Sequence, residues 1–173
     1  MNLVTCTHAR HAGAILGILN DAIENSTALY DYQPRLPDSM IGWFKAKEQG
    51  NFPVIGVESP EGELVGFASY GTFRAWPAYK YTVEHSVYIH RNYRGRGLGS
   101  KLVREIIERA KQQGVHVLVG GIDASNETSI ELHRRLGFVH AGTIRQAGFK
   151  FGRWLDLAFY QLVLPTPAKP RDG

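Results

Sequence analysis

The spacing of apolar residues predicts helices and strands along most of this chain. Apolar positions three and four apart predict a helix at 9–25 and others at 40–49, 100–113 and 128–136, the last ended by Gly137. Short β-branched or alternating segments predict strands at 3–7, 52–58, 63–70, 81–89, 115–122, 138–144 and 155–164. The expected fold is therefore α/β (α+β), with a mixed sheet of about seven strands and about four flanking helices.

Length and composition indicate one globular domain. The chain has 173 residues, of which 43% are hydrophobic and 21% charged, and its net charge is +4. We expect a single domain at 1–164 and a flexible tail at 165–173, because the tail holds three prolines and no core residues. Cys6, the single cysteine, excludes an internal disulfide. Without a membrane-length apolar segment or an RNA-binding motif, we expect a cytoplasmic protein with no membrane or nucleic-acid partner.

The most informative segment is the glycine loop, defined here as residues 94–100, between the strand at 81–89 and the next helix. It lacks the third glycine of a dinucleotide-binding fingerprint and the Lys-Ser/Thr pair of a P-loop. A strand, a glycine-rich basic turn and a helix start together suit a phosphate or diphosphate. A solvated basic turn is the simpler alternative. The basic residues around it are Arg91, Arg94, Arg96, Lys101 and Arg104.

The pattern Arg94-x-x-Gly97-x-Gly99 resembles the coenzyme A diphosphate loop of the GNAT N-acetyltransferases, and the element order is similar to their fold. Four further strings, at 24–27, 82–88, 132–138 and 148–156, resemble the phosphinothricin and methionine sulfone/sulfoximine N-acetyltransferases. The resemblance implies an enzyme that transfers the acetyl group of acetyl-CoA by direct attack. The acceptor would be the α-amino group of a small amino acid or analogue: methionine sulfone, methionine sulfoximine or phosphinothricin.

We expect main-chain N–H groups to bind the diphosphate, with the Arg94 and Arg96 side chains screening its charge. The resemblance further implies that the pantetheine arm lies along residues 87–89 and bonds to Asn126, which could also be a plain helix N-cap. The predicted cofactor-binding residues are Val87, Tyr88, Ile89, Arg94, Gly95, Arg96, Gly97, Leu98, Gly99, Ser100 and Asn126. A backbone N–H at Val87 or Tyr88 is expected to face the developing oxyanion. No metal is expected, since the histidines are scattered.

For catalysis, the resemblance points to Glu84 as the general base, directly or through water. His133 stands where many GNAT enzymes carry a tyrosine that protonates the leaving thiolate. It could act as acid or base, could orient the sulfur, or could be a helix-surface residue. Strand alternation turns His85 to the face opposite Glu84, so His85 cannot share the base role without a bulge.

The predicted substrate site comprises Tyr30, Arg74, Trp76, Pro77, Tyr79, Glu84, His85 and Ser86. The resemblance assigns the substrate α-carboxylate to Arg74. Phosphinothricin-specific members carry an arginine near the position of Trp76, so an indole there favours a less anionic sulfone or sulfoximine. Residues 150–154 form a late hairpin that this family uses near its pocket and dimer contact, or simply a solvated hairpin. A homodimer is expected from the resemblance alone, and the purpose is detoxification or housekeeping.

Two rival functions share the glycine loop. A ribosomal-protein or peptide N-terminal acetyltransferase would need an open acidic groove, whereas the aromatic residues and prolines at 30–37 and 73–79 favour a closed pocket. A non-catalytic acetyl-CoA-binding regulator would need neither Glu84 nor His133. Thiol release across a panel of amines would separate these functions.

Overall fold

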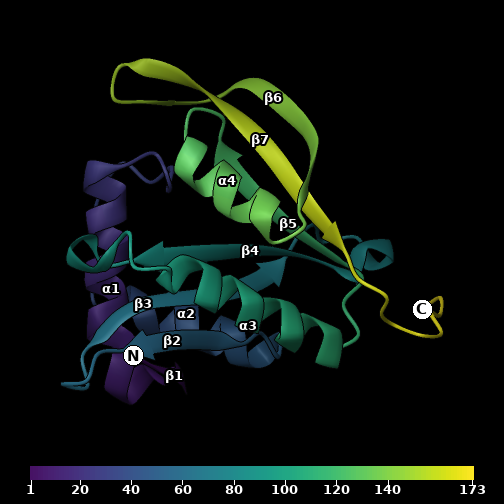
Figure 1. Ribbon diagram of the computed structural model, residues 1–173, viewed down its shortest axis with the longest axis horizontal. Coiled ribbons are helices and arrows are strands. Elements are labelled where there is room, and N and C mark those ends of the chain that lie inside the picture. Colours follow the sequence, from purple (N-terminus) through teal and green to yellow (C-terminus); the bar gives the residue numbers. More distant parts are fainter. The chain divides into compact units, whose positions relative to one another are not determined.

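Seven strands and four α-helices form in the order that the hydrophobic pattern predicts. The computed structural model describes residues 1–173 (Figure 1). In chain order the elements are β1 (Asn2–Thr5), α1 (His8–Asn25), α2 (Ser39–Gln49), β2 (Val54–Glu58), β3 (Leu64–Thr72), η1 (Pro77–Tyr79), β4 (Thr82–Ile89), η2 (Arg91–Tyr93), α3 (Leu98–Gln112), β5 (Val117–Asp123), α4 (Glu127–Arg135), β6 (Val139–Lys150) and β7 (Arg153–Val163), the η elements being 3₁₀ turns.

The strands are hydrogen-bonded in the order β1-β2-β3-β4-β5-β7-β6. The pair β4–β5 is parallel, whereas β1–β2, β2–β3, β5–β7 and β6–β7 are antiparallel. This arrangement confirms the expected mixed sheet and the α/β class.

The chain separates into two compact units. Unit 1 comprises residues 1–70 and 86–106. Its core joins apolar residues of α1 and α2 to residues of β2 and β3: Cys6, Ile15, Ile18, Leu19, Met40, Val54, Leu64 and Phe67. The apolar face predicted for the first helix is thus confirmed, since all five residues of that face are buried: Ile15, Ile18, Leu19, Ala22 and Ile23.

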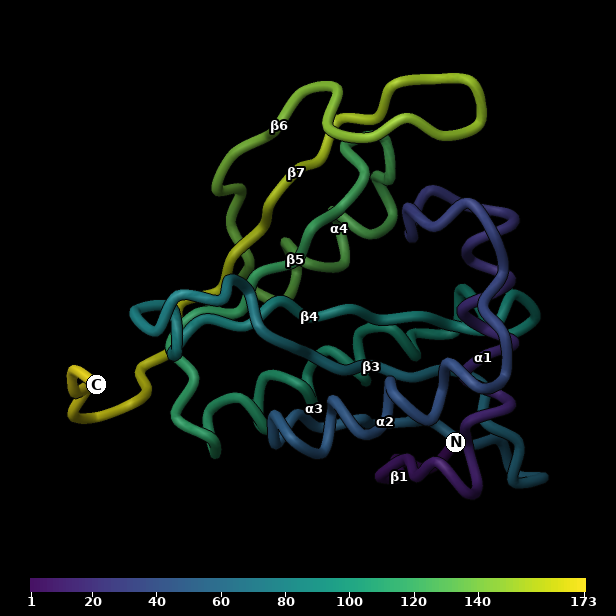
Figure 2. Tube along the Cα trace, turned by 180° about the vertical axis from the view of Figure 1, so that it is seen from behind, coloured from purple at the N-terminus to yellow at the C-terminus, as the bar shows by residue number.

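Unit 2 comprises residues 71–85 and 107–173. In it α4 packs beside β5 and β7, because His133 lies against Gly120 and the Arg134 guanidinium lies over the Tyr160 ring. β6 and β7 form a long hairpin (Figure 2). Beyond β7, the His116 ring donates to the Thr166 carbonyl at 2.8 Å. No helix of the structure has the length and apolarity that crossing a membrane requires.

The largest error in the predicted boundaries concerns this hairpin. The pattern predicted strands at 138–144 and 155–164, but the pairing continues to a tight turn at Phe151 and Gly152, where φ is 52° and 72°. β6 has solvent on most of its length, and its register shifts between Ile144 and Gly148. An exposed, irregular edge strand lacks the regular apolar alternation by which strands are recognised.

Candidate active site

The glycine loop follows β4 and the short turn η2 and leads into α3. Gly95 and Gly97 adopt φ values of 75° and 74°, which strongly favour glycine. Apart from the adjoining residues of the chain, no atom lies within 4 Å of the point where a Cβ would sit on either glycine. Lys101 N–H donates to the Gly97 carbonyl at 3.1 Å, so the preceding N–H groups belong to the first helical turn, which has no intrahelical acceptor for them. This open backbone cradle fits a diphosphate.

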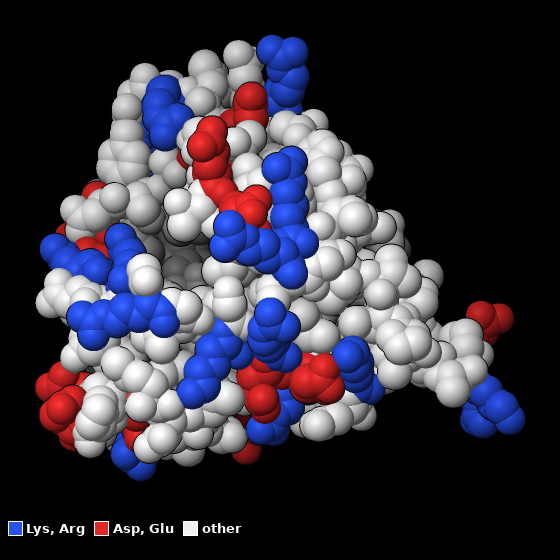
Figure 3. Space-filling model, viewed as in Figure 1, with Lys and Arg blue, Asp and Glu red and all other residues white.

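Basic side chains gather over the loop and the start of α3 (Figure 3). In this structure they contact protein groups. Arg94 Nε donates to the Ile89 carbonyl at 3.2 Å, and Arg96 donates to the Asn92 carbonyl at 3.1 Å. Lys101 Nζ donates to the Met1 carbonyl at 2.7 Å. The predicted screening of phosphate charge by Arg94 and Arg96 therefore stays a prediction.

The second half of β4, residues 86–89, also belongs to unit 1 and is half-buried. The Tyr88 ring packs on Phe67 with a centroid separation of 5.5 Å. A Cβ on Gly66 would lie 2.7 Å from Ile89 Cδ1, so this glycine permits the close approach of β3 and β4. Tyr30 lies in the same unit, on the irregular segment between α1 and α2.

Unit 2 brings together Glu84 and Arg74. Glu84 lies on β4 and remains solvent-accessible, while the protein around its carboxylate raises its pKa by desolvation. The Arg74 charge opposes this rise. The Arg74 guanidinium lies over the Phe73 ring, 5.4 Å from its centroid. The Tyr79 ring packs edge-on against the same Phe73 ring, with the centroids 5.7 Å apart.

The remaining predicted aromatic position, Trp76, is 67% exposed and precedes Pro77, which begins η1. Unit 2 thus carries the predicted base, the predicted carboxylate-binding arginine and four further substrate-site candidates: Trp76, Pro77, Tyr79 and His85.

Two consecutive glycines of β5 accommodate side chains on both faces of the sheet. A Cβ on Gly121 would lie 3.0 Å from Glu84 Oε1. A Cβ on Gly120 would lie 3.1 Å from His85 Cε1 and 3.4 Å from His133 Nε2. Because successive strand residues face opposite sides, Glu84 and the histidines lie on opposite faces, as alternation predicted for His85. Sequence reasoning missed the role of Gly120 and Gly121, although adjacent glycines inside a strand signal that other groups approach the strand closely.

His85 and His133 form a buried pair, 5% and 3% exposed. Their Nε2 atoms are 2.9 Å apart, and His133 Nδ1 lies 2.7 Å from the Ser129 carbonyl. A carbonyl only accepts, so His133 Nδ1 carries the proton and His133 Nε2 accepts from His85 Nε2–H. His85 Nδ1 then presents a lone pair and is buried without a hydrogen-bond partner.

Both histidines are held neutral. Burial, followed by the charge of His133, lowers the pKa of His85 to about 3, with the Val119 main chain opposing. Burial also lowers the pKa of His133, against its bond to Ser129. The alternative that His133 is an exposed helix-surface residue is therefore wrong.

Three other predictions concern single residues. Asn126 caps α4, because its side chain accepts from Ser129 N–H at 3.1 Å; its contact with pantetheine stays a prediction. Cys6 lies in the unit 1 core, where burial raises the pKa of its thiol to about 12, so it is no activated nucleophile. No group of three or more His, Cys, Asp or Glu side chains that could hold a metal ion occurs in the structure.

Comparison with known proteins gives the family of this chain. Residues 17–138 match the acetyltransferase (GNAT) family. An L-methionine sulfoximine/L-methionine sulfone acetyltransferase from Pseudomonas paraeruginosa is 46% identical over 157 residues, which cover 90% of this chain and 91% of the relative.

Two solved structures share the fold over nearly the whole chain. A phosphinothricin acetyltransferase from Sinorhizobium meliloti in complex with AcCoA has a TM-score of 0.94 at 32% identity, covering 99% of this chain and 94% of that one. A ribosomal-protein-alanine N-acetyltransferase from Brucella melitensis has a TM-score of 0.92 at 43% identity, covering 95% and 100%. With its mixed seven-stranded sheet and four helices, the chain belongs to the GNAT acetyltransferase family.

Proposed function

We propose that this protein is an acetyl-CoA-dependent N-acetyltransferase that acts on the α-amino group of a small amino acid or amino-acid analogue. The open cradle of the glycine loop carries this proposal, because its two left-handed glycines leave space where any other residue would place a side chain. The homologous methionine sulfoximine/sulfone acetyltransferase supports the choice of acceptor.

The N–H groups of residues 95–100 would hold the diphosphate, and residues 87–89 would lie along the pantetheine arm. When bound, acetyl-CoA supplies the acetyl group of its thioester. Arg74 would bind the α-carboxylate of the amino acid as a charge-assisted pair. Tyr30, Trp76, Pro77 and Tyr79 would contact the rest of the substrate, and Ser86 follows His85 on β4.

Glu84 would accept the proton that the α-ammonium must lose before its nitrogen can attack. A carboxylate with a raised pKa is a better proton acceptor than an ordinary glutamate, and the access of solvent permits direct or water-mediated transfer. His133, the second catalytic residue that the resemblance implies, has its Nδ1–H bound to Ser129 and its Nε2 bound to His85, on the face of the sheet opposite Glu84. We therefore propose it as a positioning residue that holds His85, and with it β4, against α4, rather than as the acid or base.

We propose methionine sulfone or sulfoximine as better acceptors than phosphinothricin. Trp76 presents an exposed indole rather than a cation. By the resemblance, phosphinothricin-specific members carry an arginine near this position. An indole offers no charge to a phosphinate, whereas it can contact a neutral sulfone.

The experiment is a panel assay of thiol release from acetyl-CoA with methionine sulfone, methionine sulfoximine, phosphinothricin, spermidine and an Ala-initiated peptide. The expected result is a kcat/KM for methionine sulfone that exceeds the values for all the others except the sulfoximine. A preference for phosphinothricin would refute the role of Trp76. Release with none of the amines would leave the non-catalytic regulator as the better interpretation.

A peptide N-terminal acetyltransferase is the second candidate, favoured by the similarity to the Brucella melitensis structure. Its acceptor is also an α-amine, so the glycine loop and Glu84 would serve it equally well. In the panel it would acetylate the peptide in preference to every free amino acid.

We propose further that the enzyme acts in the cytoplasm as a homodimer and detoxifies amino-acid analogues by converting their α-amine to an amide. The exposed aromatic residues at the β6–β7 turn, Phe149, Phe151 and Trp154, support a self-association surface. Sedimentation equilibrium of the wild type and of Trp154→Ser tests the dimer: a monomeric wild type would contradict it.

A further inference from the structure

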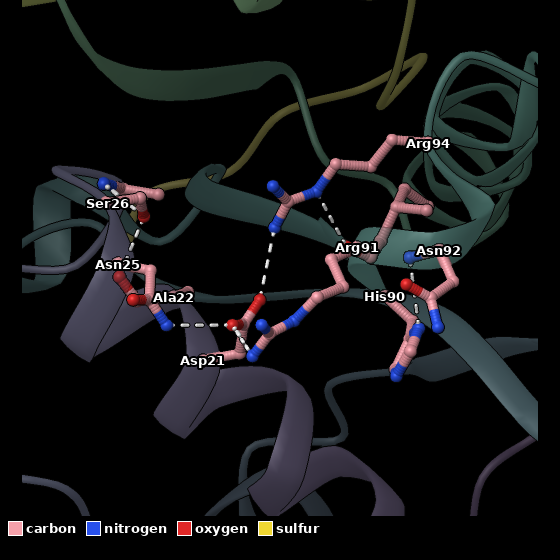
Figure 4. Close-up of polar contacts among 10 residues, drawn as sticks. Asp21, Ala22, Asn25, Ser26, His90, Arg91, Asn92 and Arg94 are labelled. Carbon is pink, nitrogen blue, oxygen red and sulfur yellow. Dashed lines mark hydrogen bonds and ion pairs between the residues drawn. The ribbon is translucent and has the colours of Figure 1, made fainter.

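Asp21 binds both arginines that flank the short turn before the glycine loop (Figure 4). It lies on α1, 73 residues before Arg94, and only 14% of its side chain is exposed. Its Oδ1 pairs with Arg91 Nη2, and its Oδ2 pairs with Arg94 Nη2 at 3.3 Å. Asn25, one turn further along α1, donates from Nδ2 to Oδ1 at 2.9 Å. Both carboxylate oxygens are therefore engaged.

The two arginines anchor the chain on either side of η2. Arg94 donates from Nε to the carbonyl of Ile89, the last residue of β4, so one guanidinium ties the end of this strand to α1. Arg91 begins η2 and is tied to the same aspartate. The chain is thus fixed immediately before Gly95 turns to its left-handed conformation. Hydrogen bonds between ionised partners are shorter and stronger than neutral ones, which suits them to this task.

The charges of this cluster leave the loop attractive to an anion. Two guanidiniums face one carboxylate, so one positive charge remains uncompensated beside the N–H groups of the loop. The guanidiniums of Arg91 and Arg94 are directed toward Asp21 and the Ile89 carbonyl, whereas the N–H groups of the first turn of α3 have no intrahelical acceptor and can contact a diphosphate (Figure 4).

We propose that Asp21 is a positioning residue for cofactor binding. Through Arg91 and Arg94 it holds the glycine loop in its anion-binding shape before the cofactor arrives, which lowers the ordering cost of binding. The main-chain N–H groups, rather than these two guanidiniums, make the diphosphate contacts. This inference rests on the proposed function, since it concerns how coenzyme A is bound.

A direct role of Arg91 and Arg94 in binding the diphosphate would change the affinity in the opposite direction. If Arg91 and Arg94 were diphosphate ligands, Asp21 would compete with the cofactor for them, and its removal would strengthen binding. The sign of the change in affinity therefore separates the two arrangements.

The test is isothermal titration of coenzyme A into the wild type and Asp21→Asn, with initial rates measured against acetyl-CoA concentration. The asparagine keeps the size of the side chain and removes its charge. The expected result is a Kd for coenzyme A and a KM for acetyl-CoA raised about tenfold, a usual size for coupling within one charged network. At saturating acetyl-CoA, kcat should remain within about twofold of the wild type, because no reacting atom is touched.

Glu108→Gln is the matched control, since it breaks an exposed ion pair with Lys111 on α3 and should change neither constant. Unchanged or tighter binding of coenzyme A by Asp21→Asn would overturn the inference. Failure of the wild type to bind coenzyme A would instead contradict the proposed function itself.

A double variant keeps the test independent of folding defects. If Asp21 acts through Arg94, Asp21→Asn combined with Arg94→Gln should weaken binding no more than the more damaging single change does. Fully additive losses would show that the two residues act separately and would overturn the inference. Should Asp21→Asn fail to fold, the same single and double variants are made with Asp21→Glu. Its longer side chain moves the carboxylate relative to Arg94 but keeps the charge.

Discussion

Glu84 and Arg74 are the two residues whose electrostatics bear most directly on the chemistry. Desolvation raises the pKa of Glu84, and the Arg74 charge keeps that rise in check. A general base must be ionised to accept a proton, so this balance sets the lowest pH at which the proposed reaction is fast.

Replacing Arg74 by glutamine should therefore move the acidic limb of the pH profile of kcat/KM. Without the guanidinium, the pKa of Glu84 rises further, and the limb should shift to higher pH. Arg74→Lys keeps the charge and should shift it less. The profile is measured with methionine sulfone, whose own ionisation is common to all three proteins. An unmoved limb in Arg74→Gln would mean that Glu84 is not the titrating base.

At the residue scale, the sequence suggests candidates for the chemistry but not their contacts. The family resemblance points to Glu84 and Arg74, whose roles stay predictions, and strand alternation places His85 on the face opposite Glu84. The bond between His85 and His133 depends on how α4 packs against β5, and the pairing of Asp21 with Arg94 joins residues 73 positions apart. Neither contact leaves a periodic pattern in the chain.

At the scale of elements, the glycine loop and the β5 glycines do what no side chain could. In the loop, Gly95 and Gly97 adopt a left-handed φ, a backbone conformation that occurs in anion-binding turns. In β5, Gly120 and Gly121 leave space for the two histidines and for Glu84.

Gly97→Ala should weaken acetyl-CoA binding. An alanine at φ 74° costs about 1–2 kcal/mol, and a loop that relaxes this strain would raise the KM for acetyl-CoA about 5- to 30-fold. Gly62→Ala is the matched control, because Gly62 has φ 84° and equally open surroundings in the β2–β3 turn. Both variants should lose similar stability in urea denaturation. Equal KM values would contradict the role of the loop.

Alanine substitutions in β5 should separate catalysis from stability. Gly121→Ala places a Cβ 3.0 Å from Glu84 Oε1 and should lower kcat about ten- to a hundredfold by displacing the carboxylate. Gly120→Ala crowds the buried His85 ring and should mainly lower stability, by about 1–3 kcal/mol. Stopped assays and thermal melts of both variants provide the check, and a larger loss of kcat in Gly120→Ala would reverse the assignment.

The elements themselves are well predicted by the hydrophobic pattern. Every predicted helix and strand appears, and the first helix buries its apolar face in the unit 1 core. The predicted bounds of β6 and β7 were wrong near their shared turn, because the exposed edge strand β6 is stabilised by backbone pairing rather than by burial.

At the scale of the whole molecule, the buried histidine pair links folding to pH. The unfolded chain binds protons at histidines near pH 6.5, whereas the pKa of folded His85 is about 3 and that of His133 is lowered. The unfolded state therefore binds more protons below pH 6.5, and stability is lost as the pH falls.

Urea denaturation at pH 7.5, 6.5 and 5.5 should show this loss in the wild type, up to about 1.4 kcal/mol per pH unit for each histidine. His85→Phe removes one of the two groups and should flatten the dependence between pH 6.5 and 5.5. A slope as steep as that of the wild type would show that other groups cause it.

The fold of the family accommodates many acceptors, so function depends on the site rather than on the sheet. The central claim is that Glu84 removes a proton from an amine that then receives the acetyl group. The most direct test is the pH profile of kcat for methionine sulfone with Glu84→Gln and wild-type protein, alongside calorimetry with acetyl-CoA. We predict a loss of roughly 10²- to 10⁴-fold in kcat with unchanged acetyl-CoA affinity. Turnover by Glu84→Gln equal to that of the wild type across the pH range would contradict the account.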